Sequence, residues 1–80
     1  MNDPDIRAHI EALVREEHEL LERAEQTPLD SNQHARLGAV NVQLDQFYDL
    51  LRQRRARRDA GQDTELAHLR KAKIVEGYEQ

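Results

Sequence analysis

The strongest chemical signal in the sequence is a block of arginines at residues 52–58. A guanidinium group forms paired hydrogen bonds with a carboxylate or a phosphate, so this block is suited to an acidic protein segment or to a nucleic-acid backbone. The block contains no aromatic side chain on which bases could stack, which argues against single-stranded nucleic acid. The predicted partner-binding residues are Arg52, Arg54, Arg55, Arg57 and Arg58.

Glu17 and the histidines are the other side chains that could do chemistry. Glu17 falls at the centre of an apolar stripe, where a carboxylate is a candidate acid, base or metal ligand. The favoured alternative is that Asn41 or an arginine hydrogen-bonds Glu17 and so fixes the register of two helices. A di-iron helix needs Glu-x-x-His, but Arg15 stands three residues before His18. The remaining histidines are His9, His34 and His68.

No other motif in the sequence indicates catalysis or cofactor binding. The chain has no His-Glu-x-x-His and no glycine-rich phosphate loop, and its one serine, Ser31, lies in a predicted helix cap. It has no cysteine, and therefore no disulfide, thiol nucleophile or thiolate metal site. We expect no enzyme activity, no cofactor and no metal.

The arginine block continues a helix that is predicted over residues 31–60. Asp30 and Gln33 have the spacing of a capping box at its start, and Gly61 is suited to end it. Its apolar residues recur at spacings of three and four, which is the pattern of one helix face. These residues are Leu37, Val40, Leu44, Phe47 and Leu51.

A first helix is predicted over residues 4–26. Asp3 is the expected N-cap, and Pro4 occupies the first helical position, where its missing amide hydrogen costs nothing. The helix ends at Thr27 because the following Pro28 disfavours helical backbone. The connection to the second helix is short, so the two helices must lie antiparallel as a hairpin.

The register of the hairpin follows from its turn, and opposed residues have numbers that sum to about 57. This register places Leu13 opposite Leu44 and Ile10 opposite Phe47. It also carries the arginine block past the acidic N-terminus, within reach of Asp3. Neutralisation of the block inside the chain is therefore the alternative to partner binding.

The predicted fold class is all-α, with a coiled-coil-like two-helix hairpin over residues 1–61 and a short C-terminal helix or tail over residues 62–80. Asp63 is a candidate cap for a short helix through Leu69. A lone hairpin has little core, so we expect two copies to form a homodimeric four-helix bundle. Leu50 favours this because it points to one side of the apolar stripe. The predicted core or dimer seam is Leu13, Leu37, Val40, Leu44, Phe47, Leu50 and Leu51.

Composition and charge limit the classes of function. Charged residues make up 35% of the chain, and its formal net charge is -4. Net acidity argues against a general nucleic-acid or membrane-surface binder, although the arginine block remains a local cationic site. No apolar stretch approaches the roughly 20 residues of a membrane span, and no signal peptide is recognisable. We expect a cytoplasmic protein.

The sequence resembles a known family of small bacterial proteins that are grouped only as a domain of unknown function. The resemblance is carried by residues 44–58, by Gly61-Gln62-Asp63 and by the ending Val75-Glu76-Gly77-Tyr78-Glu79-Gln80. The chain departs from the family pattern at Tyr48, where a tryptophan is expected, and at Thr64 and Lys71, where prolines are expected. The family has no assigned activity. The resemblance implies that the tail folds back onto the hairpin.

These patterns together predict an interaction or regulatory module. We expect it to self-associate and to bind a protein partner through the arginine block. An accessory nucleic-acid-binding protein that uses residues 52–58 is the alternative.

Overall fold

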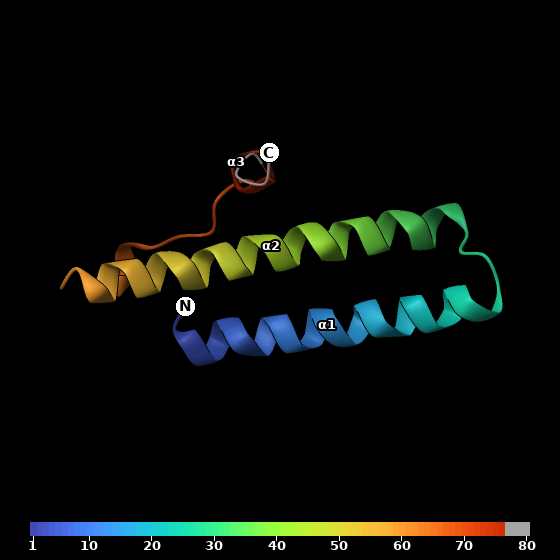
Figure 1. Ribbon diagram of the computed structural model, residues 1–80, viewed down its shortest axis with the longest axis horizontal. Helices are drawn as coiled ribbons and strands as arrows, with labels where there is room; N and C mark the ends of the chain where they lie inside the picture. The colour runs from blue at the N-terminus through green and yellow to red at the C-terminus, as the bar shows by residue number, and fades with distance from the viewer. Residues whose placement is uncertain (77–80) are drawn as a thin grey trace.

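The computed structural model describes residues 1–76 as a long antiparallel helical hairpin with a C-terminal segment laid along its second helix (Figure 1). The hairpin consists of α1 (Asp3–Gln26) and α2 (Ser31–Asp59). The C-terminal segment contains a 3-10 turn, η1 (Thr64–Leu66), and one short helix, α3 (Ala72–Glu76). The predicted all-α fold with an antiparallel hairpin and a short C-terminal helix is confirmed.

Helix α1 begins one residue earlier than expected. The side chain of Asn2 accepts a hydrogen bond from the Asp5 amide at 2.9 Å, and the Asp5 carboxylate accepts one from the Asn2 amide at 3.4 Å. Asn2 and Asp5 thus form a capping box, which satisfies two amides of the first turn. The prediction of Asp3 as the N-cap was wrong, and its carboxylate is available for another contact.

Both ends of α2 follow the sequence signals. The Asp30 carboxylate accepts from the Gln33 amide at 2.8 Å, and the Gln33 side chain accepts from the Asp30 amide at 3.0 Å, so the predicted capping box is confirmed. After Asp59 the chain turns at Gly61, whose φ of 71° lies in the left-handed region that glycine adopts without strain. The helix therefore ends where the sequence predicted, within one residue.

The core of the hairpin lies where the predicted register places it. Leu13, Val40 and Leu44 form a buried cluster, and half-buried apolar residues pack against it. The His9 ring stacks on Phe47 with centroids 5.0 Å apart, close to the expected pairing. Nearer the turn, Arg36 NH2 donates to Glu16 Oε1 at 2.7 Å and ties the two helices together.

The predicted seam residues are not equally buried. Leu37, Phe47 and Leu51 are half-buried. Four others are buried, namely Leu13, Val40, Leu44 and Leu50. The burial of Leu50 corrects our argument for a dimer, because that residue was expected to need a second hairpin.

The chain's own C-terminal segment packs on the helix that carries Leu50. Leu50 is 4% exposed and Val75 of α3 is 3% exposed. Helix α3 packs on α2, and in Figure 1 it lies on the side of α2 away from α1. Dimerisation remains a prediction, but Leu50 no longer supports it.

The C-terminal segment is less helical than expected. A helix from Asp63 through Leu69 was predicted, but only η1 forms, with Asp63 capping it. At Ala67 the backbone becomes extended, with φ -71° and ψ 139°. The tail does fold back onto the hairpin as far as Glu76, whereas the contribution expected from Tyr78 falls outside the described residues.

Candidate partner-binding groove

Arg54, at the centre of the arginine block, is committed to contacts within the chain. Its side chain is buried, with Nε 2.6 Å from Oδ1 of Asp3. Its NH1 donates to the Thr64 carbonyl at 3.3 Å and to Glu65 Oε1 at 3.5 Å. Arg54 therefore joins the start of α1, the end of α2 and η1.

Asp3 also accepts a hydrogen bond from Arg58. Arg58 NH2 lies 3.1 Å from Asp3 Oδ2, and about half of the Arg58 side chain is exposed. The hydrogen bond from Arg54, aided by the bond and charge of Arg58, holds the pKa of Asp3 below its ordinary value. Asp3 thus remains ionised and anchors two arginines of the block.

Arg57 is turned toward the C-terminal segment. Its NH1 donates to Gln62 Oε1 at 3.2 Å, and the residue is half-buried. Of the five predicted partner-binding arginines, Arg54, Arg57 and Arg58 therefore bond to the chain itself. Arg52, Arg55 and Arg58 remain exposed.

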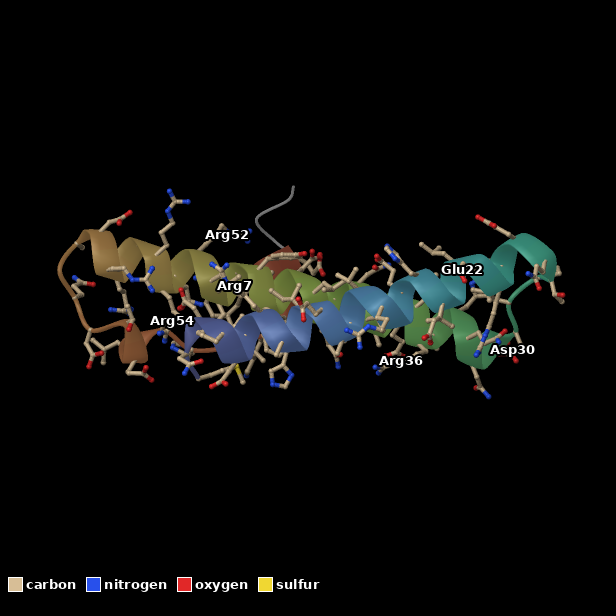
Figure 2. The ribbon with its side chains drawn as sticks, turned by 90° about the horizontal axis from the view of Figure 1, so that it is seen from below. Arg7, Glu22, Asp30, Arg36, Arg52 and Arg54 are labelled. Atoms are coloured by element: carbon tan, nitrogen blue, oxygen red, sulfur yellow. The ribbon has the colours of Figure 1, made fainter. Side chains whose placement is uncertain are left out.

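The exposed arginines line a groove between the start of α1 and the second half of α2. The groove has a volume of about 290 Å³. Figure 2 shows Arg7 of α1 and Arg52 of α2 along the same edge of the hairpin. We call this site the cationic groove; it is lined by Asp3, Arg7, Tyr48, Leu51, Arg52, Arg55 and Arg58.

Arg7 is a member of the cationic groove that the sequence analysis missed. The register that places Ile6 opposite Leu51 also brings its neighbour Arg7 beside the arginine block, so the signal was available. In the part of the chain that the structure describes, Arg7, Arg52 and Arg55 form no ion pair. The groove therefore holds three guanidinium groups that can bind an external anion.

The cationic groove also has an apolar component. Tyr48 is 43% exposed, and Leu51, which also lines the groove, is half-buried. A ring beside guanidinium groups can pack against apolar parts of a ligand whose charged groups meet the arginines. The groove is thus suited to a ligand with both acidic and apolar groups.

A second face of α2 binds the C-terminal segment through polar side chains. We call residues 62–76 the strap. Gln53 Nε2 donates to the His68 carbonyl at 2.8 Å, and Gln46 Nε2 donates to the Arg70 carbonyl at 3.1 Å. Because these side chains satisfy backbone groups that a helix would have satisfied, the strap runs extended between η1 and α3.

Asp49 is the buried centre of this second face. It is 2% exposed and accepts hydrogen bonds from Arg70 Nε and Gln53 Nε2, each at 2.9 Å. The hydrogen bond from Arg70 is the main cause that lowers the pKa of Asp49, with Gln53 and the charge of Arg52 adding to it. Asp49 is therefore a paired structural carboxylate.

The spacing of this polar face is visible in the sequence, but the sequence analysis did not interpret it as a binding face. Gln46, Asp49 and Gln53 recur at spacings of three and four, so they share one side of α2 with Leu50. Polar residues on a helix face are usually solvated, and nothing in their types indicates a bound backbone. The sequence analysis therefore missed the attachment of the strap.

Glu17 and the histidines, the remaining candidates for chemistry, form no metal site in the described part of the chain. Glu17 is half-buried. Within residues 1–76, no group of three or more histidine, aspartate or glutamate side chains is placed to hold a metal ion. No helix in the same residues is both long enough and apolar enough to span a membrane.

Comparison with known proteins gives one family and a small set of relatives. The model of the family described as "Protein of unknown function (DUF2630)" matches residues 2–80. Uncharacterised proteins of Mycobacterium bovis and of two strains of Mycobacterium tuberculosis are each 42% identical over 77 residues, covering 95% of this chain and 88% of the relative. No solved structure matches the chain.

Proposed function

The chain belongs to the DUF2630 family, and we propose that it is a small helical interaction module whose cationic groove binds an acidic segment of a protein partner. The family resemblance inferred from the sequence is confirmed, and it assigns no activity. Because the family assigns no activity, the proposal of partner binding rests on the geometry of the cationic groove. The proposal also includes self-association, as the sequence analysis expected.

One observation carries the proposal. Arg7, Arg52 and Arg55 converge on one groove, and none of them forms an ion pair within residues 1–76. Charge-assisted hydrogen bonds between guanidinium and carboxylate groups are about twice as strong as neutral ones. Three such donors on two packed helices present a fixed pattern to an acidic ligand.

A protein partner is favoured over nucleic acid for two reasons. First, the groove combines its arginines with Tyr48 and Leu51, which suit the mixed surface of an acidic helix or loop. Second, the whole chain has a formal net charge of -4, which repels a long polyanion beyond the groove. Since Arg54 is buried and Arg57 is bonded to Gln62, the cationic surface is also shorter than the sequence suggested.

A binding titration with defined probes tests the proposal. The probe is a fluorescein-labelled helical peptide with glutamates and leucines on one face, and the readout is fluorescence anisotropy. We expect saturable binding that is weakened about tenfold by the double substitution Arg52→Gln and Arg55→Gln, because two charge-assisted contacts are lost. Arg15→Gln with Arg23→Gln is the matched control, since these exposed arginines lie outside the groove, and it should bind like the wild type.

Duplex DNA of similar charge is the second probe. Nucleic-acid binding predicts a log-log salt slope of about -0.9 per phosphate neutralised. DNA binding that is tighter than peptide binding, and that is lost in the Arg52→Gln and Arg55→Gln variant, would replace the protein proposal. If the groove variant and the control bind the peptide equally, the groove is not the site.

A further inference from the structure

We propose that a second copy of the chain docks antiparallel along α1, with its Glu25 beside Arg7 and its Leu21 against Ile10 and Val14. This inference rests on the self-association that the proposed function includes, and it names the surface, the direction and the register. The proposed interface shares Arg7 with the cationic groove, whereas Arg52 and Arg55 of that groove lie outside it. The evidence for the inference is the exposure, the shape and the charge of one face of α1.

An incompletely buried stripe runs along α1. Arg7, Ile10, Val14, Leu21 and Glu25 are separated by three, four, seven and four residues, which keeps them on one side of a helix. Leu21 is 46% exposed, and Ile10 and Val14 are only half-buried although they pack against the hairpin core. We call these five residues the α1 stripe.

The strap does not cover the α1 stripe. Helix α3 and η1 pack on α2, and Figure 1 shows α3 and α1 on opposite sides of that helix. The strap is bonded to the face of α2 that carries Gln46, Asp49, Leu50 and Gln53. The α1 stripe is therefore left uncovered by the strap.

A hollow on α1 is placed to receive a side chain of the second copy. It has a volume of about 400 Å³ and is lined by Ile10, Glu11, Val14, Arg15 and His18. Residues spaced like Arg7, Ile10, Glu11 and Val14 form the four corners of a hole in knobs-into-holes packing. In an antiparallel pair whose opposed residue numbers sum to about 32, Leu21 of one copy enters this hole of the other.

Charge selects the antiparallel direction. The α1 stripe has a basic residue, Arg7, at one end and an acidic residue, Glu25, at the other. An antiparallel pair places the acidic end of each α1 next to Arg7 of the other copy, and the two-fold axis makes this contact twice. A parallel pair would instead place Glu25 beside Glu25 and Arg7 beside Arg7 of the other copy.

The register brings Glu25 opposite Arg7 and His18 opposite Val14. Arg52 and Arg55 lie on α2, one helix away from the α1 stripe. The proposed interface along the α1 stripe contains three apolar residues per copy, so it is small and resembles a transient interface. We therefore expect a dimer that dissociates at about micromolar concentration.

A charge swap tests both the surface and the direction, with sedimentation equilibrium as the readout. Arg7→Glu and Glu25→Arg should each weaken the dimer about tenfold, because each places like charges opposite one another twice. The double variant should restore the wild-type dissociation constant, because the swap recreates both pairs. A dimer on another surface, or in a parallel direction, would not be restored.

A second pair of variants tests the apolar contact. Leu21→Glu should abolish the dimer, whereas Leu66→Glu, at the more exposed Leu66 of the strap, should leave it intact. Because both leucines are exposed, both variants should keep the wild-type helical circular dichroism. A wild-type protein that is monomeric at millimolar concentration, or a Leu21→Glu variant that still dimerises, would overturn the inference. Acidic-peptide binding by the Leu21→Glu variant tests the cationic groove separately.

Discussion

Arg54 Nε lies 2.6 Å from Asp3 Oδ1, which joins two residues that are 51 positions apart in the sequence. Arg54 is 6% exposed and also contacts η1. The block of arginines therefore has two roles. Arg54 closes the open end of the hairpin and fixes the strap, while its exposed neighbours Arg52 and Arg55 line the cationic groove.

Replacing Arg54 should destabilise the hairpin. Arg54→Ala leaves Oδ1 of Asp3 and the Thr64 carbonyl without their donor, and we expect a loss of about 2–4 kcal/mol in the free energy of unfolding. Urea unfolding followed by circular dichroism measures this loss. Arg55→Ala, at an exposed position one residue along, should change the same quantity by less than about 0.5 kcal/mol. Equal effects of the two substitutions would contradict the structural role of Arg54.

Asp49 should control the attachment of the strap. Asp49→Asn keeps the size of the side chain but loses the ion pair with Arg70, so the strap should open more often. We expect the amides of Ala67, Ile74 and Val75 to exchange with solvent about tenfold faster, as measured by hydrogen exchange. Asp45→Asn, one helical turn earlier on α2, should leave these amides unchanged.

The stability of the protein should fall in acid through Asp3 and Asp49. Hydrogen bonds from Arg54 and Arg70, respectively, hold the pKa values of these carboxyl groups below the ordinary value of 3.8. As the pH falls below about 4, the unfolded chain takes up protons at these positions before the folded chain does, so the free energy of unfolding decreases. Above about pH 5 these two groups are ionised in both states and contribute no pH dependence.

Unfolding free energies measured in urea between about pH 2 and pH 6 check this dependence. Asp49→Asn should give a shallower decrease in acid, because one of the two groups has been removed. A variant with the same pH dependence as the wild type would contradict the ionised pairing of Asp49.

We expect the ring of Tyr48 to contribute to ligand binding. Tyr48→Ala removes an exposed apolar surface from the cationic groove, and we expect the acidic peptide to bind about threefold to tenfold more weakly. Tyr48→Phe keeps the ring and should bind within about twofold of the wild type. Fluorescence anisotropy measures both. If the two variants lose the same affinity, the phenolic hydroxyl is the group that matters.

The sequence predicted the hairpin well because its determinants are local. Apolar spacing fixes the faces of the helices, and Asp30, Gln33 and Gly61 fix the ends of α2 through contacts with near neighbours. The register follows from the short turn, and the contact of Asp3 with Arg54 lies at the expected sum of residue numbers. Each of these features depends on only a few residues, so it can be predicted from a single sequence.

The strap and the division of the arginine block depend on distant contacts and could not be predicted in the same way. Gln46 and Gln53 bind backbone carbonyls of residues that follow at least 15 positions later. Leu50 looked uncovered because nothing local indicates that the C-terminal segment packs on α2. Among the arginines, Arg54 also bonds to Thr64 and Glu65, and no local pattern in the sequence indicates these two contacts.

Photo-crosslinking from position 48 tests the central claim most directly. The photoreactive residue benzoylphenylalanine replaces Tyr48, which lies in the cationic groove. The crosslinking is done in cells that produce the protein, and mass spectrometry identifies the segment that becomes attached to position 48. We expect a protein segment rich in aspartate and glutamate, with a yield that falls in the Arg52→Gln and Arg55→Gln background and not in the Arg15→Gln and Arg23→Gln background. Attachment to nucleic acid, or an equal yield in both backgrounds, would contradict the claim that the groove binds an acidic protein partner.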